Sequence, residues 1–197
     1  MGVVGIRGRA AGEVRIVPAT ADRWDDVVRL AGDRGFTSGC WCMWWRLTSK
    51  EFTTGSGEER RAALASLVAD GTEPGLLAYA GDTPIGWVAA ASRAAYPRLD
   101  RSPKLRPVDD EPVWAITCFY IDRHHRRKGV GEQLLRAAVA HARDRGATIL
   151  EGYPIDTAER APASADLYTG TLGIFTRAGF HEVERRGGRP IVRHRPD

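Results

Sequence analysis

The chain of 197 residues is long enough to bury a substantial core as one domain, and its 43% hydrophobic and 27% charged residues are typical of a globular protein. It has no apolar run of about 18 residues, which excludes a membrane-spanning helix, so no membrane partner is predicted. The net charge of +4 is small and the basic residues are scattered, which argues against nucleic-acid binding.

The cysteine count and the first residues bear on the location of the protein. Residues 1–12 have no long apolar segment, so we expect a mobile tail rather than a secretory signal, followed by a single domain over residues 13–197. Three cysteines, an odd number, indicate reduced thiols in the cytoplasm. The pair Cys40 and Cys42 has no second pair of ligands at metal spacing, so no metal site is predicted.

Hydrophobic periodicity and turn residues predict alternating strands and helices in chain order. The stretch 93–111, rich in proline, is predicted to be an irregular functional loop because loops of that length are uncommon in compact domains. The expected elements are a strand over 13–17, helices over 21–31 and 58–69, strands over 75–80, 85–91 and 113–121, a helix over 130–145, a strand over 147–153, a helix over 163–178, and strands over 180–183 and 190–193.

The segment from Arg126 to Gly131 carries the clearest functional signal. It lies between a predicted strand and a predicted helix, and it combines two glycines with three cations. Such a turn lets backbone N–H groups and a helix N-terminus approach a phosphate closely. The dinucleotide fingerprint needs a third glycine, and the Walker loop needs a different spacing, so both nucleotide-binding motifs are excluded.

The remaining pattern, R-x-x-G-x-G after an apolar strand, resembles the acyl-CoA-binding motif of the GCN5-related N-acetyltransferase (GNAT) superfamily. The segment from Gly173 to Phe180 is similar to a second signature of that family, and the predicted elements follow its order, β-α-α-β-β-β-α-β-α-β-β. The resemblance covers about residues 13 to 195. It implies an α/β fold with a mixed α+β sheet whose central strands splay apart.

The resemblance further implies that acetyl-CoA is the co-substrate. The main chain of Phe119 and Ile121 matches the positions that contact the acetyl and pantetheine arm. The CoA diphosphate would bind the loop residues Arg126, Arg127, Lys128, Gly129, Val130 and Gly131.

The usual catalytic side chains of the family do not stand at the matching positions. Phe175 occupies the place of a tyrosine that donates a proton to the leaving thiolate, and Ala115 that of a glutamate base. Tyr168 is the best substitute donor, seven residues before Phe175 and on the same face if one helix holds both. A covalent mechanism through Cys118 is an alternative.

The acceptor site is predicted between the first two helices. Trp41, Cys42, Trp44 and Trp45 would form an aromatic wall able to hold an apolar or cationic amine. The carboxylates Glu151 and Asp156, at the end of the fifth strand, are candidates to reach the acceptor and to act as a base.

The favoured hypothesis is therefore acetylation of a primary amine of a small molecule, of metabolite or antibiotic type. A protein or peptide N-acetyltransferase and a non-catalytic acyl-CoA sensor are the alternatives. The acceptor identity stays open, and so does the oligomeric state, a homodimer included.

Overall fold

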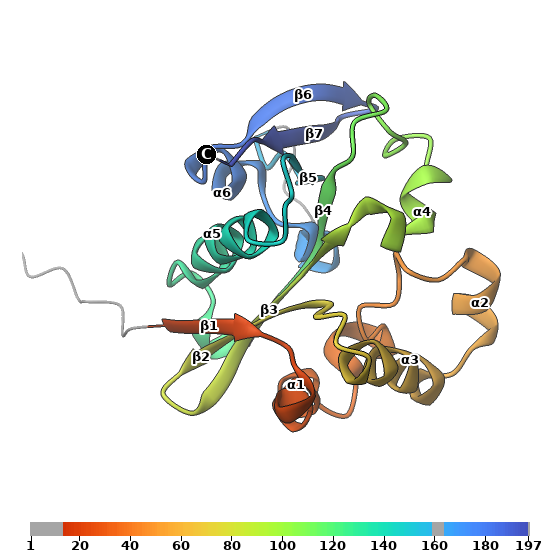
Figure 1. Cartoon of the computed structure of the whole chain (residues 1–197), viewed down its shortest axis with the longest axis vertical. Coiled ribbons are helices and arrows are strands. Elements are labelled where there is room, and N and C mark those ends of the chain that lie inside the picture. Colours follow the sequence, from red (N-terminus) through yellow and green to blue (C-terminus); the bar gives the residue numbers. More distant parts are fainter. Residues whose placement is uncertain (1–13, 159–163, 197) are drawn as a thin grey trace, which may run out of the picture.

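A computed structural model describes residues 14–158 and 164–196, which build a sheet of seven strands (Figure 1). The strand order is β1-β2-β3-β4-β5-β7-β6, and every neighbouring pair is antiparallel except β4 with β5. The strands are β1 (Val14–Pro18), β2 (Gly75–Ala80), β3 (Thr83–Ser92), β4 (Trp114–Ile121), β5 (Leu150–Gly152), β6 (His181–Arg186) and β7 (Arg189–His194). The expected tail over residues 1–12 lies outside the described residues.

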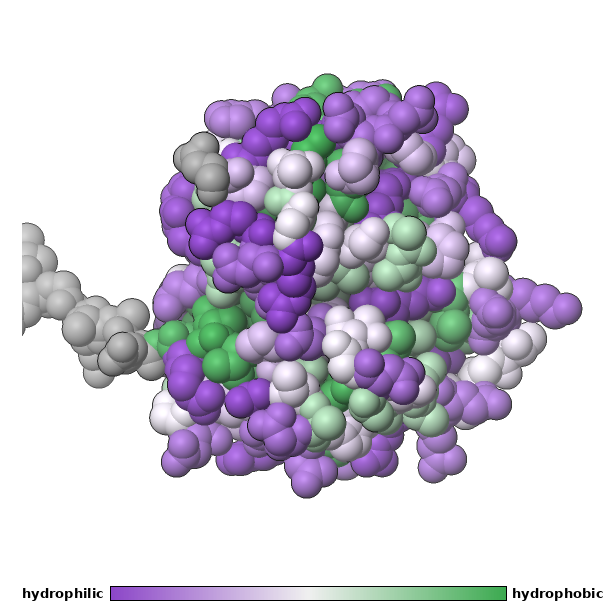
Figure 2. Space-filling model, in the orientation of Figure 1, coloured by the Kyte–Doolittle hydropathy of each residue, from purple (hydrophilic) through white to green (hydrophobic). Residues whose placement is uncertain are grey.

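Helices cover both faces of this sheet, with α5 and α6 on one face and α1 and α3 on the other (Figure 1). No helix in the described ranges has the length and hydropathy to cross a membrane, and the surface seen in Figure 2 is mainly hydrophilic with small apolar areas. The helices are α1 (Trp24–Ala31), α2 (Ser49–Thr54), α3 (Gly57–Ala69), α4 (Pro97–Asp100), α5 (Val130–Arg143) and α6 (Leu172–Arg177).

The central strands bury both of their faces, which explains their continuous apolar sequence. In β2, Leu76 and Ala78 pack in the cluster under α5, while Leu77 and Tyr79 pack in the cluster under α1. The helix α5 adds Leu134, Leu135 and Ala138, spaced so that they share one face of the helix. The predicted mixed α/β fold is confirmed.

Strand β4 is the element around which the candidate site is built. It pairs with β3 along its whole length but with β5 only from Trp114 to Ile116. Beyond Ile116 the two parallel strands separate, as the splayed sheet predicts. The pairing with β3 skips Thr117, which is therefore the extra residue of a β-bulge. Because of this bulge, Cys118 and Tyr120 face the α1 side, whereas Phe119 and Ile121 face the α5 side.

The stretch 93–111, expected to be irregular, contains a short 3-10 helix (Arg93–Ala95) and α4, and the structure differs from the prediction in two further places. The helix expected over 163–178 is split into a short 3-10 helix, η5 (Ser164–Thr169), and α6. Gly170, with a φ of 81°, separates them, because this left-handed conformation does not continue a helix. Tyr168 and Phe175 are thus not on one helix face, and Leu167 is 37% exposed.

The second difference is α2, which was not predicted. Thr48 caps this helix by accepting a hydrogen bond from the Glu51 N–H, and the Glu51 side chain accepts one from the Thr48 N–H. This capping box is visible in the sequence as Thr-x-x-Glu and should have indicated a helix start. The helix carries Phe52, which turns out to line the candidate site.

Candidate active site

The loop between β4 and α5 has the shape that an anion-binding turn requires. Gly129 precedes α5 with a φ of 78°, in the left-handed region that glycine adopts without strain. The first N–H groups of α5 therefore lack acceptors inside the helix and lie at the positive end of its dipole. Arg127 and Lys128 are exposed beside them. The loop thus presents backbone donors and two cations to solvent.

Two contacts fix this loop against the end of β4. The Arg126 Nε atom donates a hydrogen bond to the Ile121 carbonyl oxygen at 3.0 Å. A Cβ atom at Gly131 would lie only 3.3 Å from the Ile121 Cδ1 atom, so glycine allows α5 to approach the strand closely. The structure thus brings together Ile121, Arg126 and Gly131, which were predicted to share one site.

An aromatic cavity of about 290 Å³ lies against β4, where Cys118 and Tyr120 face the α1 side of the sheet. Its walls come from the segment after α1, from α2, from β4 and from η5. The residues that matter most for the argument are Cys42, Trp44, Trp45, Phe52, Cys118 and Tyr168. The structure therefore places five predicted site residues in one cavity, namely Cys42, Trp44, Trp45, Phe119 and Tyr168.

Trp44 and Trp45 both line the cavity but differ in their exposure to solvent. Trp45 is 8% exposed, whereas Trp44 is 41% exposed, and the Trp44 ring packs edge-on against Phe52 with the ring centroids 4.9 Å apart. Trp41 does not line this cavity. It is buried against Trp24 and Phe36, with centroid distances of 6.3 and 6.2 Å. Trp41 thus belongs to the core, and Phe52 takes the third aromatic place.

The environments of Cys40 and Cys42 favour the neutral thiol. The Cys42 and Cys118 sulfurs are 3.6 Å apart, and neither residue forms a disulfide. The hydrogen bond with Cys118 and burial both raise the pKa of Cys42, and burial raises the pKa of Cys40 to about 11. Because the thiolate is the nucleophilic form, these environments disfavour nucleophilic chemistry at Cys40 and Cys42.

Glu151 lies outside the aromatic cavity, in a buried charge network. Its side chain is fully buried and accepts hydrogen bonds from Arg93 at 3.0 Å, Arg193 at 2.8 Å and the Tyr153 hydroxyl at 2.7 Å. Burial and the nearby Glu151 carboxylate raise the pKa of Tyr153 well above its ordinary value. A carboxylate with three strong donors holds the sheet together and is poorly placed to accept a proton from an amine.

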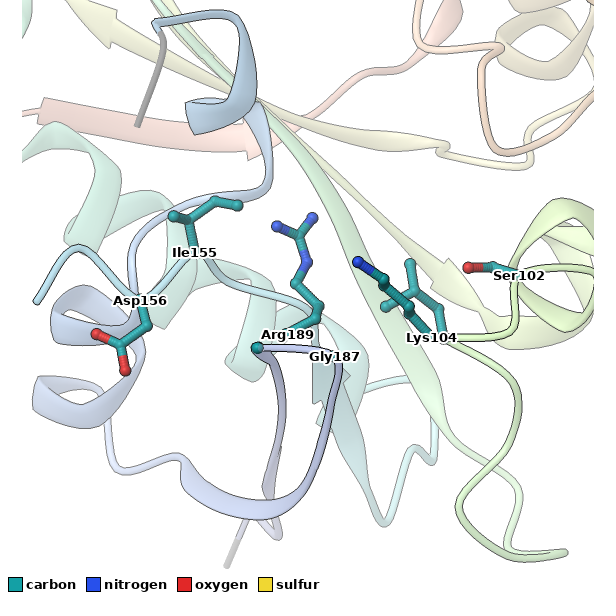
Figure 3. Close-up of a pocket in the computed structure, with 8 residues that line it drawn as sticks. Ser102, Lys104, Ile155, Asp156, Gly187 and Arg189 are labelled. Atoms are coloured by element: carbon teal, nitrogen blue, oxygen red, sulfur yellow. The ribbon is translucent and has the colours of Figure 1, made fainter. Parts of the chain in front are cut away.

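Asp156 borders a different cavity, of about 490 Å³, at the turn between β6 and β7. Figure 3 shows Arg189 and Lys104 reaching into this cavity, whereas Asp156 points away from them. Its carboxylate pairs with Arg185 at 3.0 Å, and that contact together with the Ala158 N–H lowers the pKa of Asp156. The structure therefore does not bring Asp156 to the tryptophan wall.

The positions where the family pattern places a donor and a base are both fully buried. Phe175 packs against Gly152 so closely that a Cβ atom there would lie 2.2 Å from its ring. Ala115 lies in the cluster with Tyr96 and Tyr153 and has no titratable atom. Neither Phe175 nor Ala115 can donate or accept a proton. Of the residues predicted for proton donation, Tyr168 is the one that lines the aromatic cavity. Within residues 14–158 and 164–196, no group of three or more His, Cys, Asp or Glu side chains is placed to bind a metal ion.

The fold is shared with solved acetyltransferase structures. PaiA N-acetyltransferase from Thermoplasma acidophilum, in complex with coenzyme A, is 12% identical with a TM-score of 0.54, and the match covers 93% of this chain and 99% of that one. A GNAT family acetyltransferase from Streptococcus agalactiae is 10% identical with a TM-score of 0.55, covering 93% and 96%. A structure from Corynebacterium glutamicum, described as histone acetyltransferase HPA2 and related acetyltransferase, is 14% identical with a TM-score of 0.54, covering 93% and 97%. Such low identities show a common fold alone, and no curated protein matches the chain.

A split mixed sheet with a glycine-rich loop at its central strand is the architecture of an acyl-CoA-dependent acetyltransferase, and the chain is an enzyme of this class. Residues 41–173 match the model of the acetyltransferase (GNAT) family, which is more than half of the 197 residues, so the chain belongs to that family.

Proposed function

We propose that the protein transfers the acetyl group of acetyl-CoA to a primary amine of a small molecule. The observation that carries this proposal is the aromatic cavity of about 290 Å³ on the opposite side of β4 from α5. Its volume suits a small molecule and is at the lower end of the range of ligand pockets. A peptide acceptor needs a longer open groove, so the size of the cavity favours the small acceptor over a protein substrate.

The loop from Arg126 to Gly131 would hold the CoA diphosphate. Its support is the left-handed Gly129, the free end of α5 and the exposed Arg127 and Lys128. The strand β4 would bind the acyl arm, because from Thr117 to Ile121 it pairs with β3 but not with β5. Backbone groups of Phe119 and Ile121 on this open side are then available to the thioester and to the pantetheine amides.

The reaction requires a neutral amine, because an ammonium group has no lone pair for attack on the thioester carbonyl. The attack forms a tetrahedral intermediate whose oxyanion a backbone N–H of β4 would stabilise. Breaking the C–S bond releases the CoA thiolate, and we assign Tyr168 as the group that gives it a proton. The cavity offers no side-chain carboxylate among its described lining residues, so the ammonium proton would leave through water.

A thiol-release assay with acetyl-CoA, run with small primary amines and with peptides that have a free N-terminus, tests this proposal. Release with small amines is the expected result, whereas release with peptides alone would favour a protein acetyltransferase. If the protein binds CoA but releases no thiol with any amine, it is a binding module and the proposal is wrong.

The role of Tyr168 is tested by Tyr168→Phe, with Tyr79→Phe as the control. The Tyr79 hydroxyl bonds Asp26 at 2.7 Å and does not line the cavity, so this control removes a phenol elsewhere. Loss of a proton donor should lower kcat by about 10²-fold or more and leave the KM for acetyl-CoA unchanged. Equal kcat values for Tyr168→Phe and the unmodified protein would exclude Tyr168 as the donor.

A further inference from the structure

Arg98 is a buried cation beside the aromatic cavity. It belongs to α4, is only 8% exposed, and its backbone N–H donates to the Trp45 carbonyl oxygen at 3.3 Å. The guanidinium carbon lies 3.9 Å from the centre of the Trp44 ring and 5.4 Å from that of Phe52. Both rings line the cavity, whereas Arg98 itself does not, so its charge lies just behind the aromatic wall.

This guanidinium has no carboxylate partner in the described part of the chain. Its Nε atom is buried without a hydrogen-bond acceptor. The contrast with Arg93 and Arg193 is clear, because both of those arginines share the buried carboxylate of Glu151. Buried charges in proteins are normally paired, since an isolated one is costly to remove from water. The aromatic faces of Trp44 and Phe52 offset part of that cost at Arg98. No carboxylate of the described residues is paired with the guanidinium as a counter-ion.

Two further observations connect this charge with the cavity. Tyr168 packs against the cluster that contains Leu99, the residue after Arg98. Burial lowers the pKa of Arg98, and the charge of Tyr168 acts in the opposite direction. A second cation, Arg46, stacks 4.6 Å from the centre of the Tyr96 ring and donates to its hydroxyl. Its charge lowers the pKa of the Cys42 thiol, although Cys118 and burial keep that pKa raised overall. Two arginines thus place positive charge beside the cavity.

The lining of the cavity offers nothing to balance these charges. Its described residues are aromatic, small polar or cysteine, and none is Asp or Glu. A cationic acceptor body would therefore lie beside two arginines and find no carboxylate among the described lining residues. An acceptor that carries an anionic group would instead supply the counter-ion that Arg98 lacks, and a guanidinium binds a carboxylate with two parallel hydrogen bonds.

We propose that the acceptor is an amino carboxylate with an apolar body, and that Arg98 is the residue that selects its carboxylate. The apolar body fills the aromatic cavity, and the carboxylate reaches past the edge of the wall formed by Trp44 and Phe52 to pair with the guanidinium behind it. This inference rests on the proposed function, because it names the acceptor class of that same site. It also reverses the expectation that the tryptophans hold a cationic amine.

The experiment compares matched acceptors, L-phenylalanine with L-phenylalaninamide and L-leucine with L-leucinamide. For each pair kcat/KM is measured by thiol release, and affinity in the presence of CoA is measured by calorimetry. The variants are Arg98→Met, which keeps the length of the side chain without its charge, and Arg98→Lys, which keeps the charge. Arg61→Met is the matched control, because Arg61 stacks on Trp41, which does not line the cavity.

The deciding quantity is the ratio of the value for the amino acid to the value for its amide, taken both for kcat/KM and for affinity. Arg98→Met should lower this ratio at least tenfold in both measurements, Arg98→Lys should lower it less, and Arg61→Met should leave it unchanged. A structural role of Arg98 would weaken both acceptors equally, and an unchanged ratio would overturn the inference. If amino acids bind in an Arg98-dependent manner but no thiol is released, the anion site stands and the acetyl transfer is wrong. Absence of both binding and transfer would refute the two proposals together.

Discussion

The packing at the point where β4 and β5 separate makes Gly152→Ala a sharp perturbation. A Cβ atom at Gly152 would lie 2.2 Å from the Phe175 Cε1 atom and 2.7 Å from its Cζ atom. Carbon atoms in contact are normally about 3.5–4.0 Å apart, so the ring has to move by more than about 1 Å. It has little room, because it is fully buried and packs edge-on against Phe119 and Phe180, with centroids 6.0 and 5.0 Å away.

The expected loss of stability follows from these contacts. Overpacking of a core costs about 1–3 kcal/mol, and disturbing an aromatic pair adds about 0.5–1.5 kcal/mol. We therefore expect Gly152→Ala to lower the free energy of unfolding by about 3 kcal/mol. For a chain of this size each kcal/mol corresponds to about 2–4 °C in Tm, so Tm should fall by roughly 6–12 °C.

Thermal unfolding followed by circular dichroism measures this change, and two further variants control it. Gly57→Ala places a methyl group at the first position of α3 with no atom within 4 Å, so it should leave Tm unchanged or raise it slightly. The double variant Gly152→Ala with Phe175→Leu should be more stable than the sum of the two single changes predicts, because the smaller side chain makes room for the methyl group. A Gly152→Ala protein that melts like the unmodified one would refute the reasoning.

Three more predictions follow from the same structure. Gly129→Ala should weaken CoA binding in calorimetry because it strains the loop. Gly146→Ala is the control, since Gly146 has a similar φ of 80° and no atom within 4 Å of an added Cβ, and it should lose stability but keep CoA affinity. Equal CoA affinities of the two variants would contradict the role of the loop. Glu151→Gln should lower the free energy of urea unfolding by about 1–3 kcal/mol, because it removes the buried carboxylate that two arginines share although each keeps an aspartate partner. Glu132→Gln at the surface should change it little. Burial lowers the pKa of His141 below its ordinary 6.5, so the unfolded chain binds more protons than the folded one at low pH. The free energy of unfolding should therefore fall as the pH drops through and below 6.5. His141→Gln should reduce this fall, and an unaltered pH profile would show that His141 is not its source.

The fold was accessible from the sequence because its signals are local. Leu134, Leu135 and Ala138 repeat at helical spacing, and the glycine loop lies where a strand gives way to a helix, so each element could be assigned from its neighbours. The break at Gly170 was missed because a glycine inside a helical pattern is often tolerated, and only its positive φ shows that the helix ends there.

The candidate site was accessible only in part, because its cavity depends on contacts between distant segments. Trp44 and Trp45 could be proposed from their sequence, but Trp41, which was proposed with them, differs in its neighbours rather than in residue type, because it packs against Trp24 and Phe36 away from the cavity. Glu151 could be taken for a base until the structure placed two arginines on it. The position of Arg98 beside the cavity could not be predicted from the sequence, because only the structure shows which rings it contacts and that no carboxylate of the described residues pairs with it.

The alternation of side chains in β4 after Thr117 has a consequence for how such an enzyme can change. Because neighbouring residues of the strand face opposite sides of the sheet, the side chains of Cys118 and Tyr120 reach the aromatic cavity, while those of Phe119 and Ile121 pack under α5. Substitutions at alternate positions of one strand can therefore remodel the cavity while leaving the packing under the glycine loop intact. Deleting Thr117 would bring Ile116 and Cys118 into consecutive pairing with Ala90 and Ala89, so the two sets would keep their sides of the sheet. The division of the strand between cavity and core would therefore survive the loss of the bulge itself.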